Sequence, residues 1–154
     1  MNPYASHLAS HDPLSVIAST PEKLQDLLHK LGPAGLELPY APGKWSPRQV
    51  VAHLADTEIA FAFRIRQALA EPDHVIQPFD QTAWSHHYEA YDAATALTVF
   101  QAVRNWNLAL LRSLPKTAFA RTVTHPERGT MTLQTILETM GGHDLNHLSQ
   151  LRAD

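Results

Sequence analysis

Two histidines lie four residues apart near the C-terminus, in the stretch GGHDLNHLSQL that runs from Gly141 to Leu151. Side chains four apart on an α-helix share one face, so His143 and His147 can each direct a nitrogen at the same ion. A helical wheel places both imidazoles at the edge of an apolar face and Asp144 close to its centre. Because buried polar groups are costly when unpaired, these side chains need either hydrogen-bond partners or a metal ion, and the pattern favours the metal.

A metal centre requires at least one further protein ligand, and His53 is the candidate. His53 lies beside Val50, Leu54 and Phe61 on the inward stripe of a helix expected over residues 47–70. A lone histidine at this place would be interpreted as a hydrogen-bonded core residue, but with the C-terminal pair it completes a set of three. Three imidazoles leave coordination positions open for water or substrate, which is the arrangement of catalytic metal sites.

Two aspartates near these histidines are candidates for catalytic roles. Asp144 follows His143 directly and takes the place of the glutamate in H-E-x-x-H sites, where the carboxylate is the general base. Aspartate is one methylene shorter, so an inward hydrogen bond to another helix is at least as good an interpretation. Asp56, three residues after His53, can orient that imidazole, or it can be a solvent-facing carboxylate. Gln150 lies one helical turn beyond the second histidine and can form a hydrogen bond near the site.

Other groups near this set have structural interpretations. Glu58 is expected to be a helix-surface charge or the partner of an arginine. Arg64, roughly 16 Å beyond His53 along the helix, is expected to pair with a buried acid rather than to bind substrate. Trp45, just before the helix, is expected to pack against its first turn. His125 precedes the C-terminal helix and lies too far along the axis to reach the ion.

Start and stop signals divide the chain into four helices. A cap, a proline at the first helical position and an acid occur together at Thr20-Pro21-Glu22, and Ser46-Pro47 repeats the signal. Apolar residues recur at helical spacing in the segments that follow, and Pro126 to Gly129 form a turn between two short extended pieces. The helices are expected over residues 21–31, 47–70, 92–114 and 133–151.

Four helices with one long and two shorter connections predict an all-α four-helix bundle. Residues 1–12 are unpatterned and are expected to be an irregular lead-in to a single domain over residues 13–154. The 22 residues between the second and third helices are long enough to run back along the bundle. His53 lies near the start of its helix and the C-terminal pair near the end of another, so these two helices must be antiparallel. The predicted order is down-up-up-down, with the long crossover between helices 2 and 3.

The long crossover adds candidates for the site. In this topology it brings Trp84, His86, His87 and Tyr88 back to the metal end of the bundle. The alternative is a surface loop that carries one aromatic anchor. Which of the four side chains line the site depends on how the crossover packs.

Composition restricts the classes of function. The chain has 154 residues, a net charge of −3, ten histidines and no cysteine, which excludes disulfides and a thiol nucleophile of its own. Its basic residues are scattered singly, so nucleic acid is not an expected partner. It has neither a signal-peptide pattern nor about 18 continuous apolar residues, so we expect a cytoplasmic protein with no membrane partner. Ile59 and Phe63 form a second apolar face on their helix, which indicates burial on two sides or a homodimer interface.

Three stretches together carry a resemblance to a known family: GKWSPRQVVAHLADTE, HPERGTMTL and GGHDLNHLSQL. They resemble the DinB-like (YfiT-like) family of bacterial metal-binding four-helix bundles, over about residues 13 to 152. The specific features are W-S-P at a helix start, H-L-x-D-x-E within that helix and H-x-x-x-H near the C-terminus. The resemblance implies one divalent metal ion on three histidines, which correspond to His53, His143 and His147. It also implies a homodimer, which many members form.

The resemblance further implies an activity on a small molecule. Characterised relatives include S-transferases that use low-molecular-weight thiols and a thiol-dependent isomerase, so we expect a metal-dependent transferase that joins such a thiol cosubstrate to a small electrophile. A metal-dependent hydrolase and a non-enzymatic dimeric module for metal binding or stress response are the alternatives. Three imidazoles suit zinc, nickel, iron(II) or copper, so the ligand types leave the identity of the metal open.

Overall fold

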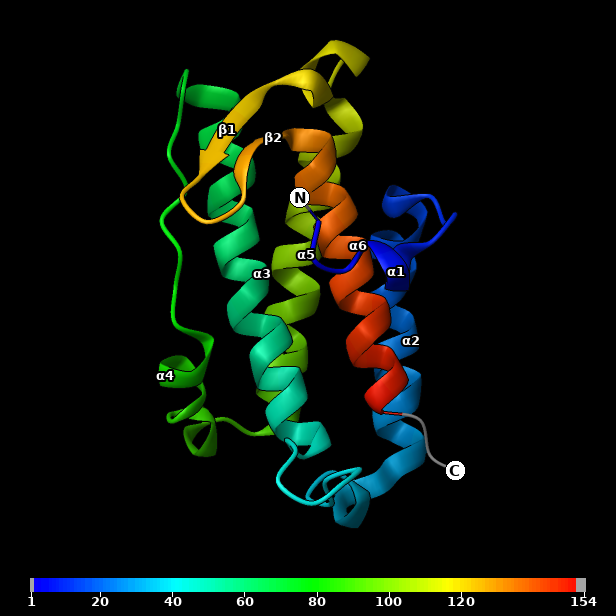
Figure 1. Cartoon of the computed structure of the whole chain (residues 1–154). Helices are drawn as coiled ribbons and strands as arrows, with labels where there is room; N and C mark the ends of the chain where they lie inside the picture. The colour runs from blue at the N-terminus through cyan, green and yellow to red at the C-terminus, as the bar shows by residue number, and fades with distance from the viewer. Residues whose placement is uncertain (1, 152–154) are drawn as a thin grey trace.

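Four long helices form the body of the molecule in the computed structural model, which describes residues 2–151 (Figure 1). They are α2 (Pro13–Gly35), α3 (Pro47–Ala70), α5 (Ala93–Ser113) and α6 (Leu133–Gln150). The shorter elements are α1 (Ala5–Leu8), α4 (Gln81–Ser85), the 3-10 helices η1 (Tyr88–Ala90) and η2 (Lys116–Ala120), and the strands β1 (Thr122–His125) and β2 (Gly129–Thr132). No helix in the described range is long and apolar enough to cross a lipid bilayer. The outermost parts of the predicted segments, Met1 and residues 152–154, lie outside the described residues.

The helix directions follow the predicted down-up-up-down order (Figure 1). α3 and α5 pack against each other and run in the same direction, whereas α2 and α6 run in the opposite direction. Two parallel neighbours need a connection about as long as the bundle, and residues 71–92 provide it by returning along the outside of α3 (Figure 1). The prediction of a four-helix bundle with a long crossover is therefore confirmed.

Local caps set the starts of the two helices that carry the histidines. At α3, Ser46 and Gln49 form a capping box: the Gln49 side chain accepts from the Ser46 amide at 2.9 Å, and the Ser46 hydroxyl accepts from the Gln49 amide at 3.4 Å. At α6, the Thr132 hydroxyl accepts from the Thr135 amide at 3.1 Å. The predicted range of 47–70 for α3 is confirmed, and its first two turns carry His53.

The first long helix begins earlier than predicted. α2 starts at Pro13, where the Asp12 side chain caps it by accepting from the Ser15 amide at 2.8 Å. Pro21, interpreted as a first helical residue, lies inside the helix instead. A proline has no N–H to donate to the carbonyl four residues earlier, which here belongs to Ile17. A side chain from another helix, Arg104 on α5, donates to that carbonyl at 2.8 Å, so the helix continues through the proline.

The segment before α2 is more ordered than the predicted irregular lead-in. It contains the one-turn helix α1, whose Leu8 is buried against Gly141 of α6. A methyl group on Gly142 would overlap the backbone of Tyr4, so this glycine allows the segment to approach α6 closely. Each glycine inside a helix costs about 1 kcal/mol relative to alanine, and the close packing accounts for their presence here. The division of the chain into a lead-in and a domain at residue 13 stays a prediction.

The two strands form the hairpin expected around Pro126–Gly129, at one end of the bundle (Figure 1). Gly129 has a φ of 77°, a conformation that favours glycine. The start of the crossover is fastened to this hairpin: the Ile76 amide donates to the Thr124 carbonyl at 2.8 Å, and the Thr124 amide donates to the His74 carbonyl at 2.9 Å. The crossover therefore begins its return from a fixed point.

A buried ion-pair network joins the four long helices. Arg104 on α5 is 1% exposed and donates to both oxygens of Glu58 on α3, at 2.9 and 2.7 Å. It also donates to both oxygens of Asp144 on α6, at 2.6 and 3.1 Å, besides its bond to α2. Asn107 adds a donor to Glu58 at 2.8 Å. Glu58 is thus the partner of an arginine, as one of its two interpretations predicts, but it lies in the core rather than on the surface.

We expect the substitution Arg104→Met to destabilise the protein by about 3–5 kcal/mol, because it leaves the carboxylates of Glu58 and Asp144 buried without their cation. Urea unfolding followed by circular dichroism measures the change. Arg112→Met, at an exposed position on the same helix, is the matched control and should change the free energy of unfolding by less than about 0.5 kcal/mol. Equal effects of the two substitutions would contradict a central role for Arg104.

Candidate metal centre

The three predicted histidines meet inside the bundle. His53 comes from α3, and His143 and His147 come from consecutive turns of α6, and each is at most 5% exposed. One nitrogen of each lies within 4.8 Å of the others, and the Nε2 atoms of His53 and His143 are 2.9 Å apart. The antiparallel arrangement of α3 and α6 therefore brings them together as the sequence analysis requires. We call these three residues the histidine trio.

Neighbouring side chains hold the outer nitrogens of two of these imidazoles. The Nδ1 atom of His53 is 3.2 Å from the phenol oxygen of Tyr88, and the Nδ1 atom of His147 is 2.8 Å from Oε1 of Gln150. An amide oxygen only accepts, so His147 donates through Nδ1 and keeps the lone pair of Nε2 for an ion. Partners of this kind fix the tautomer and the direction of metal-binding imidazoles.

Aromatic rings enclose the histidine trio. The ring of Trp45 lies 4.8 Å from that of His53 and is stacked on that of His147 at 6.4 Å, both measured between centroids. Tyr4 meets His143 edge-on at 5.2 Å. Trp45 therefore does more than pack on the first turn of α3, because it also shields two of the three imidazoles from water.

Burial keeps the trio uncharged at neutral pH. It lowers the pKa of His53 to about 3, and the charge of His147 acts in the same direction. The pKa of His143 is lowered well below its usual value by burial first, and then by its two partners and Arg104. Burial also lowers the pKa of His147, against the opposing effect of its hydrogen bond to Gln150. Neutral imidazoles offer lone pairs, and a cation needs lone pairs from its ligands.

The donor set fits a divalent transition-metal ion. Within the described residues, the cluster consists of three imidazole nitrogens and includes no carboxylate. Calcium and magnesium prefer oxygen ligands, whereas imidazoles suit zinc, nickel, iron(II) and copper. Three protein donors also leave room for a small molecule at the ion.

The two candidate aspartates lie in different surroundings. Both carboxylate oxygens of Asp144 accept from Arg104, which is the contact expected for an inward bond to another helix. A general-base role for Asp144 stays a prediction. Asp56 is half-buried, and burial raises its pKa. Burial and, secondly, the charge of Asp56 raise the pKa of Tyr88, so Asp56 acts on the phenol that holds His53.

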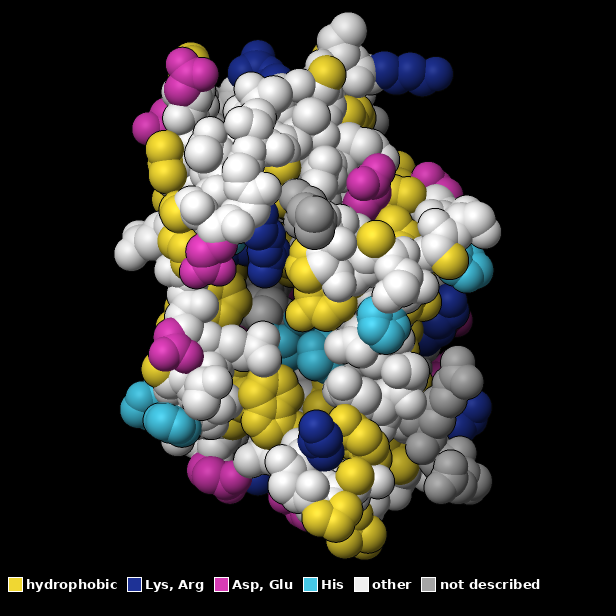
Figure 2. All heavy atoms as spheres, in the orientation of Figure 1, with side chains coloured by type: hydrophobic (Ala, Val, Ile, Leu, Met, Phe, Trp, Pro, Cys, Tyr) yellow, Lys and Arg dark blue, Asp and Glu magenta, His cyan; other side chains and the backbone are white. Residues whose placement is uncertain are grey.

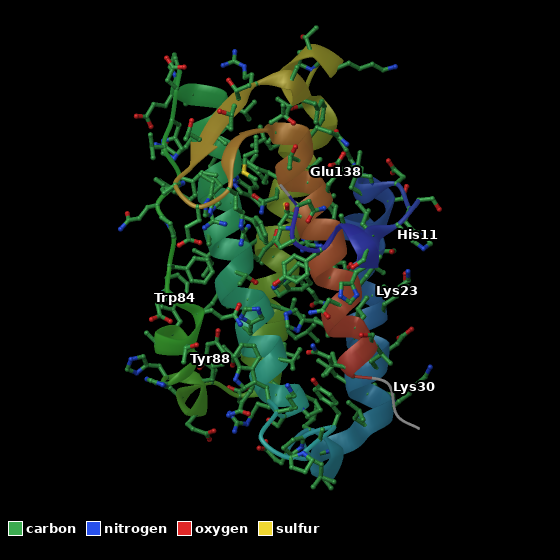
Figure 3. The ribbon with its side chains drawn as sticks, viewed as in Figure 1. His11, Lys23, Lys30, Trp84, Tyr88 and Glu138 are labelled. Carbon is green, nitrogen blue, oxygen red and sulfur yellow. The ribbon has the colours of Figure 1, made fainter. Side chains whose placement is uncertain are left out.

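The four crossover candidates divide into one buried residue and three outer ones. Tyr88 in η1 is 1% exposed and contacts the trio, whereas Trp84 is 38% exposed and stacks on Phe79 at 4.4 Å (Figure 3). His86 and His87 are exposed. The crossover is thus a surface segment with a buried aromatic anchor, and that anchor reaches a candidate ligand.

Two cavities open on the histidine trio. The first, which we call the His143 cavity, measures about 220 Å³ and lies among α3, α6, the crossover and the hairpin. The second, the His147 cavity, measures about 280 Å³. Tyr4 and Gln81 line both of them. Histidine side chains and, above them in the view, a basic side chain appear near the middle of this face (Figure 2).

His125 and Arg64, which were not expected to take part in the metal site, both line the His143 cavity. His125 is 4% exposed and accepts from the Glu127 amide at 3.2 Å, outside the trio as predicted. Arg64 does not pair with a buried acid, so that expectation is wrong. Its guanidinium carbon lies 5.9 Å from the ring centroid of Phe61 and 5.5 Å from that of Phe79. The buried acids of the described core are paired with Arg104 instead.

Two residues that shape the site, Arg104 and Tyr4, were not predicted from the sequence. Arg104 lies four residues from both Phe100 and Leu108 on the core stripe of α5, and a charged residue in such a stripe signals a buried network. Tyr4 lies in a segment without periodicity. Its signal was the pair Gly141–Gly142, because adjacent glycines inside a helix indicate the close approach of another segment.

The fold and the trio place this chain among four-helix bundles with a candidate metal-binding site between the second and fourth long helices, here α3 and α6. The family model described as the DinB superfamily matches residues 17–151, which include all three histidines. The chain belongs to the DinB superfamily.

Individual relatives agree with this membership. The chain is 30% identical to YfiT of Bacillus subtilis over 90% of this chain and 79% of that protein, and 29% identical to a protein of Oceanobacillus iheyensis over 90% and 81%. Both carry the provisional name of metal-dependent hydrolase. The solved YfiT structure, described as having an unusual four-helix bundle topology, superposes with a TM-score of 0.81 at 30% identity, over 90% of this chain and 83% of that chain. A mycothiol-dependent maleylpyruvate isomerase shares the fold, with a TM-score of 0.74 at 14% identity over 92% and 60%.

We expect acid to destabilise the metal-free protein through the trio. Between about pH 6.5 and the lowered pKa of each folded-state imidazole, the unfolded chain binds protons that the folded protein excludes. The free energy of unfolding should therefore fall with falling pH, by up to about 1.4 kcal/mol per pH unit for each histidine. Urea unfolding of chelator-treated protein from about pH 7.5 to 4.5 measures this slope.

Two variants separate this effect from general acid denaturation. His53→Gln removes one buried imidazole, so its slope should be shallower than that of the unmodified protein. His11→Gln, at an exposed position, should keep the original slope. A slope unchanged by His53→Gln would show that the trio does not control the acid sensitivity.

Proposed function

We propose that the protein is a metal-dependent enzyme in which His53, His143 and His147 hold one divalent transition-metal ion. We further propose that it transfers a low-molecular-weight thiol to a small electrophile. The observation that supports this most directly is that two cavities border the trio, one lined by His143 and one by His147. A reaction that joins two small molecules needs both of them within reach of one centre. When bound, the ion supplies a lowered pKa for a thiol or water, which makes it nucleophilic at neutral pH.

The residues around the trio would orient the ligands and exclude water. Tyr88 and Gln150 hold the outer nitrogens of two imidazoles, and Trp45 covers two rings. Tyr88 remains a neutral phenol, since burial raises its pKa above the usual value. In this proposal Asp56 contributes from outside the ligand set, through the phenol of Tyr88.

The chemistry of the transfer requires a thiol, which the side chains of this protein do not provide. The chain contains no cysteine, so the nucleophilic sulfur belongs to the thiol cosubstrate. A bond forms between that sulfur and the electrophilic carbon, the leaving group departs with the electrons of the bond that breaks, and the thiol proton passes to solvent. Reduced thiols of this kind persist in reducing compartments, which agrees with the expected cytoplasmic location.

Hydrolysis is the second candidate, and the provisional names of the relatives favour it. Water would then take the place of the thiol, and one cavity would hold the whole substrate.

We also propose that the protein forms a homodimer. Ile59 and Phe63 on the outer face of α3 are 50% and 58% exposed. Large exposed apolar side chains side by side on a helix are typical of an association surface.

Elemental analysis tests the metal site. We expect about one equivalent of a transition metal in untagged protein purified without added metal or chelator, and none in the double variant His143→Ala, His147→Ala. The double variant His86→Ala, His87→Ala removes two exposed histidines and should keep the metal. Protein that stays metal-free after incubation with zinc, nickel and iron(II) would contradict the proposed site.

A paired assay tests the reaction. We expect metal-loaded protein to accelerate the reaction in which the cysteine sulfur displaces chloride from monochlorobimane, and chelator-treated protein to lose this acceleration. The hydrolysis of 4-nitrophenyl acetate without thiol is measured beside it. Thiol-independent cleavage of the ester, with no acceleration of the transfer, would replace the transferase proposal with the hydrolase.

A further inference from the structure

The His143 cavity contains a cation that the proposed chemistry does not use. Arg64 lies on α3 and lines the same cavity as His143. Its guanidinium carbon is 5.9 Å from the ring centroid of Phe61, and the His143 ring is 6.1 Å from the same centroid. The guanidinium and the candidate ligand thus contact a common phenyl ring, so one small molecule in the cavity can reach both.

No acid of the described chain, residues 2–151, forms a hydrogen bond or ion pair with Arg64. Other inward-facing arginines in this range differ. Arg104 pairs with two carboxylates, and Arg48 pairs with Glu37 and Glu89. Arg64 is instead half-buried between the rings of two phenylalanines. An aromatic ring attracts the face of a guanidinium group. The N–H donors lie in the plane of the guanidinium, so they stay available for a hydrogen-bond acceptor.

A second arginine lines the cavity beside Arg64. The pKa of Arg64 is lowered by burial and by the charge of Arg128, which lines the same cavity. Burial, and after it the charges of Arg128 and Arg64, lower the pKa of His125. Glu127 is the acid of this lining, and its opposing effect on His125 is smaller than those of the two arginines. An anion that enters the cavity would therefore be attracted to Arg64, which lines it.

We propose that Arg64 binds an oxyanion group, a carboxylate or a phosphate, of the small molecule that occupies the His143 cavity. The reacting part of that molecule would then lie against the trio. A guanidinium can donate two parallel hydrogen bonds to such a group, and it is more weakly hydrated than an ammonium. The enzyme would thus prefer an anionic substrate to a neutral one. That the bound molecule is a substrate rests on the proposed function, but anion binding by Arg64 requires no metal.

Nuclear magnetic resonance of metal-free, nitrogen-15-labelled protein tests the inference. The probes are inorganic phosphate and propionate, with propionamide as the neutral control. We expect one or both anions to shift the Arg64 side-chain signal and the amide signals of cavity residues such as His125 and Thr139, and propionamide to shift neither. The anion that binds more tightly identifies the phosphate or the carboxylate as the recognised group. The absence of any shift with both anions would overturn the inference.

Variants assign the binding to one side chain. Arg64→Met should weaken anion binding by at least about tenfold, since a hydrogen bond to a charged group contributes about 1.5–3 kcal/mol. Arg64→Lys keeps the charge and should retain part of the affinity, whereas Arg112→Met, at an exposed position on α5, should retain all of it. Circular dichroism confirms that each variant is folded. Unchanged affinity in folded Arg64→Met would overturn the inference.

A matched pair of electrophiles extends the test to the reaction, with the carboxylate 4-chloro-3-nitrobenzoate and its amide as alternative substrates. Arg64→Met should raise KM for the carboxylate and leave KM for the amide unchanged. Metal content separates the two proposals. Anion binding at Arg64 in a protein that takes up no metal would refute the proposed function alone, and a metal-loaded trio without anion binding would refute this inference alone.

Discussion

The buried guanidinium of Arg104 is the interaction on which the rest of the structure depends. It bonds to Glu58 on α3, Asp144 on α6 and the Ile17 carbonyl on α2, so one side chain of α5 contacts each of the other three long helices. A buried charge that loses its partner is strongly destabilising, so the network disfavours relative positions of the helices in which one of these charges is unpaired. Asp144 follows His143 directly in the chain. The ion pair that aligns α3 with α6 therefore also aligns the histidine trio.

The long crossover follows from the parallel packing of α3 and α5, and it contributes to the site as well. A chain that must return along the whole bundle passes both cavities on its way. It supplies Tyr88 to the outer nitrogen of His53 and Phe79 to the ring pair around Arg64. The N-terminal segment closes another side, because Gly142 allows the Tyr4 backbone close to α6. The crossover and the N-terminal segment thus complete the surroundings of site residues that the long helices carry.

The electrostatics of the site follow from the same packing. Arg104 is paired with two carboxylates, so its positive charge is compensated within the core. The trio is neutral, since burial outweighs every other effect on its pKa values. The His143 cavity is lined instead by two arginines, Arg64 and Arg128. The neutral imidazoles of the trio are suited to a cation, and the arginines of the neighbouring cavity are suited to an anion.

The sequence by itself determined the four long helices apart from the start of the first, together with their order and the three histidines. Helical periodicity and caps such as Ser46 are local properties of the chain, and the need for His53 to meet the C-terminal pair made α3 and α6 antiparallel. The tertiary structure decided what depends on contacts between distant segments. Pro21 lies inside a helix because Arg104 satisfies the carbonyl that the proline leaves unbonded. Asp144 binds an arginine and Tyr88 contacts His53 because of how the helices and the crossover pack, which no short stretch of sequence encodes.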